Sequence, residues 1–217
     1  GEYATQYCLN VGTKPEDLPA IPGGGWFYAN YFVILTAPEE IPVSQGVRYR
    51  FSHWSVDGAS QGSGINPITV KMDMPHTAIA HYVLQYYLTV DSPHGKPSPE
   101  SGWFDAGTEI TASVTSPWPV DADTRSFCTG WTGTGSVPPS GTGTTVTFVI
   151  NEPSSITWTW KTQYMVTFTQ TGLDNTATGV IVIVGGEDKT MADLPFTGWF
   201  DHGTTYSFSS IVQSTDS

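Results

Sequence analysis

The sequence predicts an all-β fold, built as tandem small antiparallel β-sandwich-like modules in a rod-like array, with essentially no helix. Three observations lead to this prediction. Similar segments recur at a fixed spacing, which indicates a repeated module. Apolar and polar residues alternate between the turns, which is typical of half-buried strands. The 23 glycines and 16 prolines interrupt the chain, and no ten-residue segment has apolar positions at helical spacing.

The opening strand of each repeat begins with a tyrosine that is followed by apolar residues at alternate positions. These tyrosines are Tyr7, Tyr86 and Tyr164, so the starts are 79 and 78 residues apart. A fixed period of this kind predicts three copies of one module, of which the third is incomplete and lacks its C-terminal half. The expected boundaries are residues 1–84 for the first repeat, 85–162 for the second and 163–217 for the third.

A second landmark has the pattern Gly-Trp-Phe-Asp-x-Gly-Thr and predicts a tight hairpin. It occurs at Gly102–Gly107 and Gly198–Gly203, and Gly25–Asn30 is its counterpart in the first copy. The last position of this turn requires a positive φ, which glycine adopts freely and asparagine tolerates next best. Ile110 and Ala112 then alternate with polar residues, so we expect a half-buried strand after the hairpin.

The third landmark and the closing hairpin complete each full copy. Phe51–Trp54 and Cys128–Trp131 each lead into a loop rich in Gly, Ser and Thr, and we interpret their tryptophans as core residues rather than as a ligand platform. A closing hairpin follows, with a proline in its turn and alternating apolar residues in its strands. The closing strand of the second copy runs without a spacer into the third copy over Thr159–Tyr164, which predicts a stiff rod.

In this order, the landmarks resemble the divergent internalin-type B-repeat, and the resemblance covers nearly the whole chain. The wording of Lys96–Pro99 and of Ser154–Trp158 is similar to versions in large bacterial and archaeal surface proteins. The resemblance implies a secreted β repeat with a stalk or adhesive role and without catalysis.

The third copy and the segment before Tyr7 depart from the regular repeat pattern. The first two landmarks are 34 residues apart in the third copy (164 to 198) and 16 apart in the second (86 to 102), and the extra residues include the apolar run 180–184, which we expect to add a strand.

The segment before Tyr7 matches the end of a closing strand. One interpretation, which we favour, is a fragment of a longer array. The other is a donor strand that fills the sheet edge of the next subunit in a head-to-tail filament, formed by Glu2, Tyr3, Ala4, Thr5 and Gln6.

Charge and hydropathy exclude several classes of partner. Eight basic and twenty acidic residues leave a net charge of −12, which repels nucleic acids and anionic lipid surfaces. No apolar run is long enough to insert into a membrane. Only 13% of residues are charged and another 13% are aromatic, a balance that we expect of an extracellular protein at the cell surface.

The sequence offers no pattern typical of an enzyme, a metal site or a cofactor site. The five histidines have none of the spacings of zinc sites, and no Cys-x-x-Cys pair occurs. Asp121–Asp123 and Glu187–Asp188 are interpreted as solvated loop charge rather than as calcium ligands, with calcium binding left open. Cys8 and Cys128 occupy non-equivalent positions, so two buried thiols are favoured over a disulfide.

These observations favour a non-enzymatic extracellular structural repeat protein, a stalk, sheath or filament component that contacts copies of itself or neighbouring repeats of a longer chain. The alternative is an adhesive or carbohydrate-binding accessory module that binds a surface polysaccharide. The candidate binding residue for that alternative is Trp118, which lies between two prolines and is expected to be an exposed loop aromatic.

Overall fold

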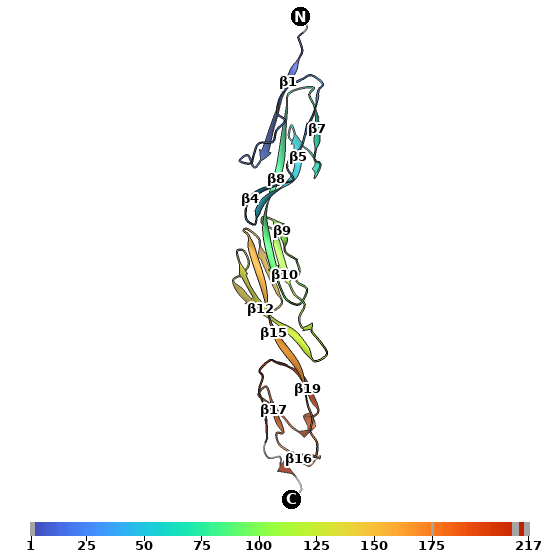
Figure 1. Cartoon of the computed structure of the whole chain (residues 1–217), viewed down its shortest axis with the longest axis vertical. Helices are drawn as coiled ribbons and strands as arrows, with labels where there is room; N and C mark the ends of the chain where they lie inside the picture. The colour runs from blue at the N-terminus through green and yellow to red at the C-terminus, as the bar shows by residue number, and fades with distance from the viewer. Residues whose placement is uncertain (1–2, 175, 210–212, 215–217) are drawn as a thin grey trace.

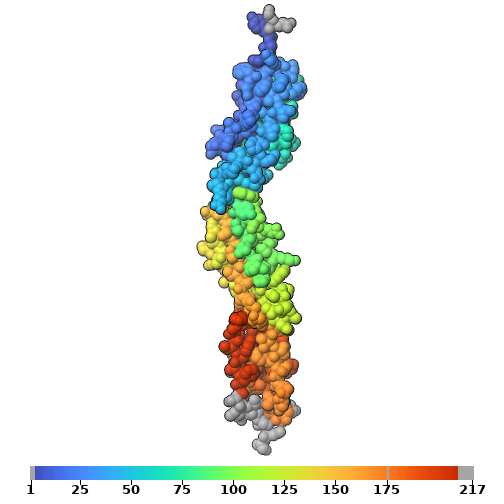
Figure 2. All heavy atoms as spheres, in the orientation of Figure 1, coloured from blue at the N-terminus to red at the C-terminus, as the bar shows by residue number. Residues whose placement is uncertain are grey.

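The computed structural model describes residues 3–174, 176–209 and 213–214. Over these residues the chain is made almost entirely of strands, and a single 3-10 turn, Met191–Asp193, is the one helical element. The predicted all-β fold with essentially no helix is therefore confirmed. The molecule is long and narrow, and the N-terminal, middle and C-terminal parts of the chain follow one another down its long axis (Figures 1 and 2).

Most strands belong to one large curled sheet. Its twelve strands are β1 (Gln6–Lys14), β2 (Gly25–Tyr28), β4 (Glu40–Ser44), β5 (Val47–Val56), β6 (Ala59–Ser63), β8 (His76–Asp91), β9 (Gly102–Asp105), β11 (Trp118–Pro119), β12 (Thr124–Thr134), β13 (Ser140–Thr142), β15 (Ser154–Phe168) and β19 (Phe196–Asp201).

The remaining strands in the described part of the chain form small sheets. Their pairings are β3 (Phe32–Leu35) with β7 (Ile68–Lys71), β10 (Glu109–Ser113) with β14 (Thr145–Val149), β17 (Val182–Val184) with both β18 (Glu187–Lys189) and β20 (Tyr206–Phe208), and β16 (Ala177–Thr178) with β21 (Gln213–Ser214).

Two long strands make the large sheet continuous, which differs from the separate sandwich-like modules expected from the sequence. β8 has 16 residues and β15 has 15. The first part of β8 lies between β1, in parallel pairing, and β5; its second part lies between β9 and the first part of β15. The predicted run of a closing strand into the next opening strand is present. The two parallel pairings were not predicted, and each of them lies within one repeat. The long strands β8 and β15 are what carry one sheet past each boundary.

Three hydrophobic cores follow one another along the chain, each packed between part of the large sheet and one small sheet. The first core is closed by β3 and β7, the second by β10 and β14, and the third by β17, β18 and β20. The first core is centred on Trp54, the second on Trp158 and the third on Phe168. Alternate residues of the small sheets point into these cores, as the period of two predicts.

The landmarks have the structural roles that their residues predict. Trp54 is fully buried, and its indole N–H donates a hydrogen bond to the side-chain oxygen of Asn66 at 3.3 Å. Trp131 is also buried and packs edge-on against Trp158, with ring centroids 5.7 Å apart. Asn30 has a φ of 67°, in the left-handed region expected of its turn. The core interpretation of the third landmark is confirmed.

The apolar run 180–184 supplies a strand, as expected, and the structure shows where that strand goes. β20 follows the second landmark just as β10 does. β10 pairs antiparallel with β14, which comes later in the chain, whereas β20 pairs antiparallel with β17, which comes earlier. Val182 and Val184 of β17 are buried in the third core. The inserted strand therefore occupies the place that β14, the first strand of the closing hairpin, fills in the second core.

Candidate interaction surfaces

The first joint, between the first and second cores, is built from Arg48, Gln85, Trp103 and Asp105. Gln85 on β8 is only 5% exposed, and Arg48 on β5 lies directly opposite it in the antiparallel register. The Arg48 Nε–H donates to Gln85 Oε1 at 2.9 Å, and Gln85 Nε2 donates to Asp105 Oδ1 at 2.7 Å. The guanidinium carbon lies 4.3 Å from the centroid of the Trp103 ring.

The second joint, between the second and third cores, repeats this arrangement with Arg125, Gln163, Trp199 and Asp201. Gln163 is 9% exposed and lies opposite Arg125. The Arg125 Nε–H donates to Gln163 Oε1 at 2.8 Å, Gln163 Nε2 donates to Asp201 Oδ1 at 2.8 Å, and the guanidinium lies 4.5 Å from the Trp199 centroid. Corresponding positions of the repeat therefore make corresponding contacts at both joints.

The four joint residues have fixed positions relative to the three landmarks of the repeat. The glutamine directly precedes the opening tyrosine, the tryptophan and aspartate belong to the second landmark, and the arginine lies three residues before the third. A buried amide is costly unless both its oxygen and its nitrogen find partners, and here the arginine and the carboxylate supply them. A guanidinium over a tryptophan face adds about 0.5–2 kcal/mol.

A second cation supports the carboxylate at each joint, but it comes from different strands. Arg50 of β5 approaches the carboxylate of the first joint at 3.6 Å, and Lys161 of β15 approaches that of the second joint at 2.5 Å. Arg50 is paired across strands with Val83, and Lys161 with Phe127, so the cation and the apolar residue have exchanged strands. The hydrogen bond from Lys161 is the main reason why the pKa of Asp201 is lowered.

An open groove runs beside the first joint. Its volume is about 660 Å³, and its aromatic wall is formed by Tyr87 and Trp103, which meet edge to face with centroids 5.2 Å apart. Gln45, Thr89 and Ser155 are among its polar lining residues. A smaller groove of about 120 Å³ adjoins Trp199 at the second joint.

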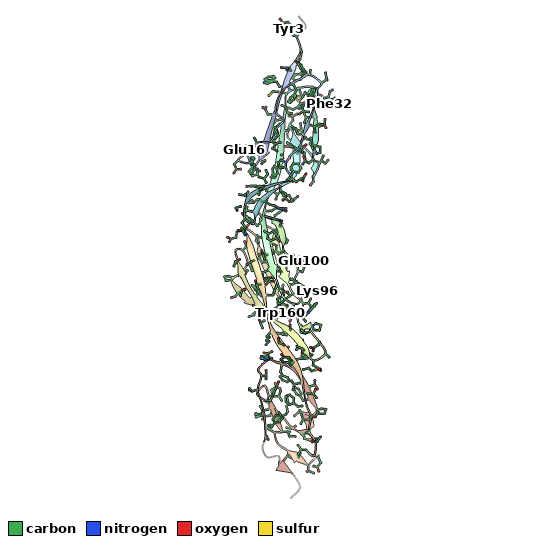
Figure 3. The ribbon with its side chains drawn as sticks, viewed as in Figure 1. Tyr3, Glu16, Phe32, Lys96, Glu100 and Trp160 are labelled. Carbon is green, nitrogen blue, oxygen red and sulfur yellow. The ribbon has the colours of Figure 1, made fainter. Side chains whose placement is uncertain are left out.

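Trp118 does not have the environment expected of it. It is half-buried in the short strand β11, opposite Ser126, rather than exposed in a loop. The Lys96 ammonium lies 5.8 Å from the centroid of its ring; Lys96 is labelled in Figure 3. Pro117 and Pro119 line the small groove of the second joint, so this tryptophan lies close to a joint. The local prolines indicated a loop, but tertiary pairing with β12 placed the residue in the sheet.

The candidate donor strand lies at the N-terminal end of the molecule. Glu2 is outside the described residues. Tyr3, Ala4 and Thr5 are exposed and belong to no strand, although the Ala29 N–H donates to the Thr5 carbonyl at 2.9 Å; Tyr3 projects from the tip of the molecule (Figure 3). Gln6 is the first residue of β1. Donation of this segment to another subunit stays a prediction.

Sequence analysis missed an exposed apolar patch beside this end. The N-terminal apolar patch consists of Trp26, Tyr28, Tyr31, Phe32 and Ile34, each more than half exposed. Aligning the first and second copies at the second landmark would have indicated this patch, because most patch residues have polar counterparts in the second copy. The counterparts of the last four patch residues are Asp105, Thr108, Glu109 and Thr111.

Two histidine arrangements lie in the first core region. His76 bridges two carboxylates, with Nδ1 2.6 Å from Asp57 and Nε2 3.2 Å from Asp73, and the hydrogen bond to Asp57 raises its pKa. His81 stacks on His53 with ring centroids 4.3 Å apart. Burial, followed by the nearby charges of His53 and Lys14, lowers the pKa of His81.

The remaining polar candidates are occupied by local contacts. Asp121 accepts a hydrogen bond from the Asp123 amide at 2.9 Å, and Glu187 pairs with Lys189 at 2.8 Å. Within the described residues, no three His, Cys, Asp or Glu side chains come together as a metal site. Cys8 is half-buried and Cys128 is buried, and both thiols are free. The preference for two thiols over a disulfide is confirmed, although Cys8 is less buried than expected.

No protein-family model matches the chain, and neither a curated protein nor a solved structure matches it. In the part of the chain that the structure describes, no helix has the length and apolar character needed to cross a membrane.

Proposed function

We propose that the chain is a non-enzymatic structural repeat protein of the cell surface, in which β modules are joined end to end into a stiff stalk, sheath or filament component. The observation that carries this proposal is the repetition of the joint. The same four residue types, at corresponding positions of two repeats, make the same hydrogen bonds and the same guanidinium–indole contact.

The joints give a physical reason for stiffness. A flexible linker contributes no fixed direction between modules. Here one strand belongs to both neighbouring cores, and a buried glutamine ties that strand to a landmark of the following module. Bending at a joint would separate Gln85 or Gln163 from a partner and leave a buried amide unsatisfied. This coupling favours a rod that holds its two ends apart.

The extracellular assignment rests on composition and on the resemblance to internalin-type B-repeats. A chain with few charges and many aromatic, Gly, Ser and Thr residues is suited to a rigid secreted β structure. In the described region, the carboxylates of Asp57 and Asp201 and the imidazole of His76 have shifted pKa values because local partners in turns and joints bind them. Such contacts favour structural roles for these groups over catalytic roles.

Small-angle X-ray scattering of the purified chain tests the rod. We expect a maximum dimension and a distance distribution of an extended, rigid particle, unchanged by salt. An Arg48→Ala, Arg125→Ala double variant is expected to broaden the distribution, whereas a variant at an exposed position away from the joints, Gln61→Ala, is not. A compact particle, or a parent chain as flexible as the double variant, would contradict the proposal.

Assembly by strand addition is tested separately, by light scattering and negative-stain microscopy of the chain with and without residues 1–6. Polymers that disappear on deletion would establish a filament subunit joined through this segment. A monomer in both preparations would instead leave a rod whose neighbours are modules of a longer chain.

A carbohydrate-binding accessory module is the second candidate, and the groove at the first joint favours it. An edge-to-face aromatic wall beside amide and hydroxyl side chains suits a sugar, which stacks its apolar face and hydrogen-bonds its hydroxyls. Retention of the chain on insoluble polysaccharide, lost in Tyr87→Ala and kept in Gln61→Ala, would support this role. Loss in Trp118→Ala alone would instead place the binding site near the second joint.

A further inference from the structure

The N-terminal end of the molecule presents one half of a joint. Gln6 directly precedes the opening tyrosine, as Gln85 and Gln163 do, and Trp26 has the position that Trp103 and Trp199 have in the second landmark. The environment differs. Gln6 is exposed and Trp26 is 69% exposed, whereas both joint glutamines are buried and both joint tryptophans are half-buried.

The two joints show what covers this surface elsewhere. At each of them an arginine-bearing strand of the preceding core, β5 or β12, pairs antiparallel with the long strand. Its arginine stands opposite the glutamine and lays its guanidinium on the tryptophan. In the described part of the chain, no such strand pairs with Gln6, which pairs only with Tyr28 of β2.

We propose that Gln6, together with Trp26 and Tyr28 of the apolar patch, forms the acceptor half of a third joint. Its occupant is a further β module of the same architecture, joined through a strand continuous with β1 and carrying an arginine opposite Gln6. The inference deepens the proposed rod by naming its partner at this end. Continuity with the two existing joints selects this occupant, because both are made through a strand shared by two modules.

The chemistry of this joint differs from that of the other two in one respect. Tyr28 has the position of Asp105 and Asp201, so the carboxylate is replaced by an exposed phenol. Without that anion there is no need for the second cation that Arg50 or Lys161 supplies. The arriving module is therefore expected to contribute one arginine and apolar contacts to the patch. At the position that corresponds to Arg50 or Lys161, it can carry a neutral residue.

A fused chain tests the proposal. Residues 85–162 are placed directly before Gln6 of the full chain, replacing residues 1–5, so that Thr162 of the added copy precedes Gln6 as it precedes Gln163. Hydrogen exchange is followed by mass spectrometry over residues 6–9 and 25–28, which occur once in the fusion. We expect exchange at least tenfold slower than in the parent chain, with most of this protection lost when only the added copy carries Arg125→Ala.

Several outcomes would overturn the inference. One is an added copy that folds, shown by protected β10 and β14 peptides in both copies, while residues 6–9 exchange as in the parent. Another is an added copy that stays unfolded. Residues 85–162 fold in the parent chain, where they precede the second joint, so their failure to fold before Gln6 would mean that no equivalent joint forms there. A Trp26-dependent dimer of the parent chain, or Trp26-dependent retention on polysaccharide, would assign the surface to a different occupant.

The third joint can be disproved while the proposed rod still stands, because two separate experiments test them. The scattering measurement uses the parent chain alone and does not depend on the fusion. An extended parent whose fused form leaves Trp26 and Gln6 unprotected removes only the third joint, whereas a compact parent removes the rod itself.

Discussion

The second and third cores begin with the same landmarks but are closed by strands from opposite directions in the chain. β14, which follows the second landmark, closes the second core; β17, which precedes that landmark, closes the third. In both, a valine or phenylalanine at alternate positions fills the space over the large sheet. The comparison shows that a β core requires a strand in the right place and orientation, and that chain order is secondary.

The two solutions differ in how much apolar surface they bury. The second core has two packed tryptophans and several fully buried aliphatic residues, whereas the described third core buries Phe168, Val182 and Val184. Phe168 makes up for part of this difference with aromatic contacts to Phe196, Phe200, Tyr206 and Phe208, the closest at 5.0 Å between centroids. Such pairs add about 0.5–1.5 kcal/mol each beyond burial, so the third core depends heavily on one residue.

The largest effect is expected from Trp158→Ala in the second core. Trp158 is 2% exposed and packs against Trp131, so its removal leaves a cavity and should lower the free energy of unfolding by about 3–5 kcal/mol. Urea denaturation followed by circular dichroism measures the change. Tyr3→Ala, at a fully exposed position, should leave the midpoint unaltered. A loss no larger than that of the control would mean that the second core is not the stable centre of the molecule.

Phe168→Ala tests whether the third core can open alone. We expect a loss of about 3 kcal/mol confined to this core, because the second core shares strand β15 with it but few buried side chains. Hydrogen exchange should become faster in β17 and β20 and stay unchanged in β10 and β14. Phe32→Ala, at a 60% exposed phenylalanine of β3 that lies outside the third core, is the matched control. Faster exchange in all four strands would show that the cores unfold as one.

The joints should contribute less than the cores. Arg125→Ala leaves the Gln163 side-chain oxygen without the donor that satisfies it, and we expect the free energy of unfolding to fall by about 1–3 kcal/mol. Arg48→Ala should cost a similar amount at the first joint. A double-mutant cycle with Gln163→Ala measures the coupling, since replacing both partners should cost less than the sum of the single changes. Additive effects would remove the joint as a cooperative contact.

The smallest effect is expected from pH, which addresses the first core through two histidines. The pKa of His81 is lowered, so its neutral form stabilises the fold above its ordinary value of 6.5, and this contribution is lost as pH falls below it. The pKa of His76 is raised, so the ion pair with Asp57 contributes fully below 6.5 and is lost as pH rises through the raised pKa.

Urea midpoints between pH 5 and pH 8 separate the two histidines. His81→Gln is expected to remove the loss of stability on the acid side, and His76→Gln the loss on the alkaline side. Neither variant should alter exchange in β17 and β20 of the third core. An unchanged pH profile in both variants would show that other groups control the pH dependence of the first core.

Local patterns predicted the elements of the fold with good accuracy. Alternation identified the strand around Ile110, a continuous apolar run identified the strand around Val182, and turn chemistry identified the positive φ of Asn30. Trp54 and Trp131 were correctly interpreted as core residues. These inferences succeed because side-chain direction in a strand and the steric demands of a turn depend on neighbouring residues alone.

The candidate surfaces were beyond such patterns. Arg48 and Gln85 are 37 residues apart, and their contact depends on the register of β5 against β8, which the sequence does not specify. Trp118 was expected to be exposed, and its pairing with β12 half-buries it. The apolar patch around Trp26 left one signal in the sequence, the polar counterparts of most of its residues in the second copy, but no local pattern showed that its side chains are exposed.

The sequence by itself determined that this is a repeated β protein, where its turns fall and which side chains enter the cores, because alternation and backbone sterics are local properties. The tertiary structure alone decided that one sheet crosses the repeat boundaries, that an inserted strand takes in the third core the place that β14 has in the second, and that the same four side chains meet at both joints. Those features depend on strand partners far apart in the chain, and pairing is selected by the burial of the whole core rather than by any one segment.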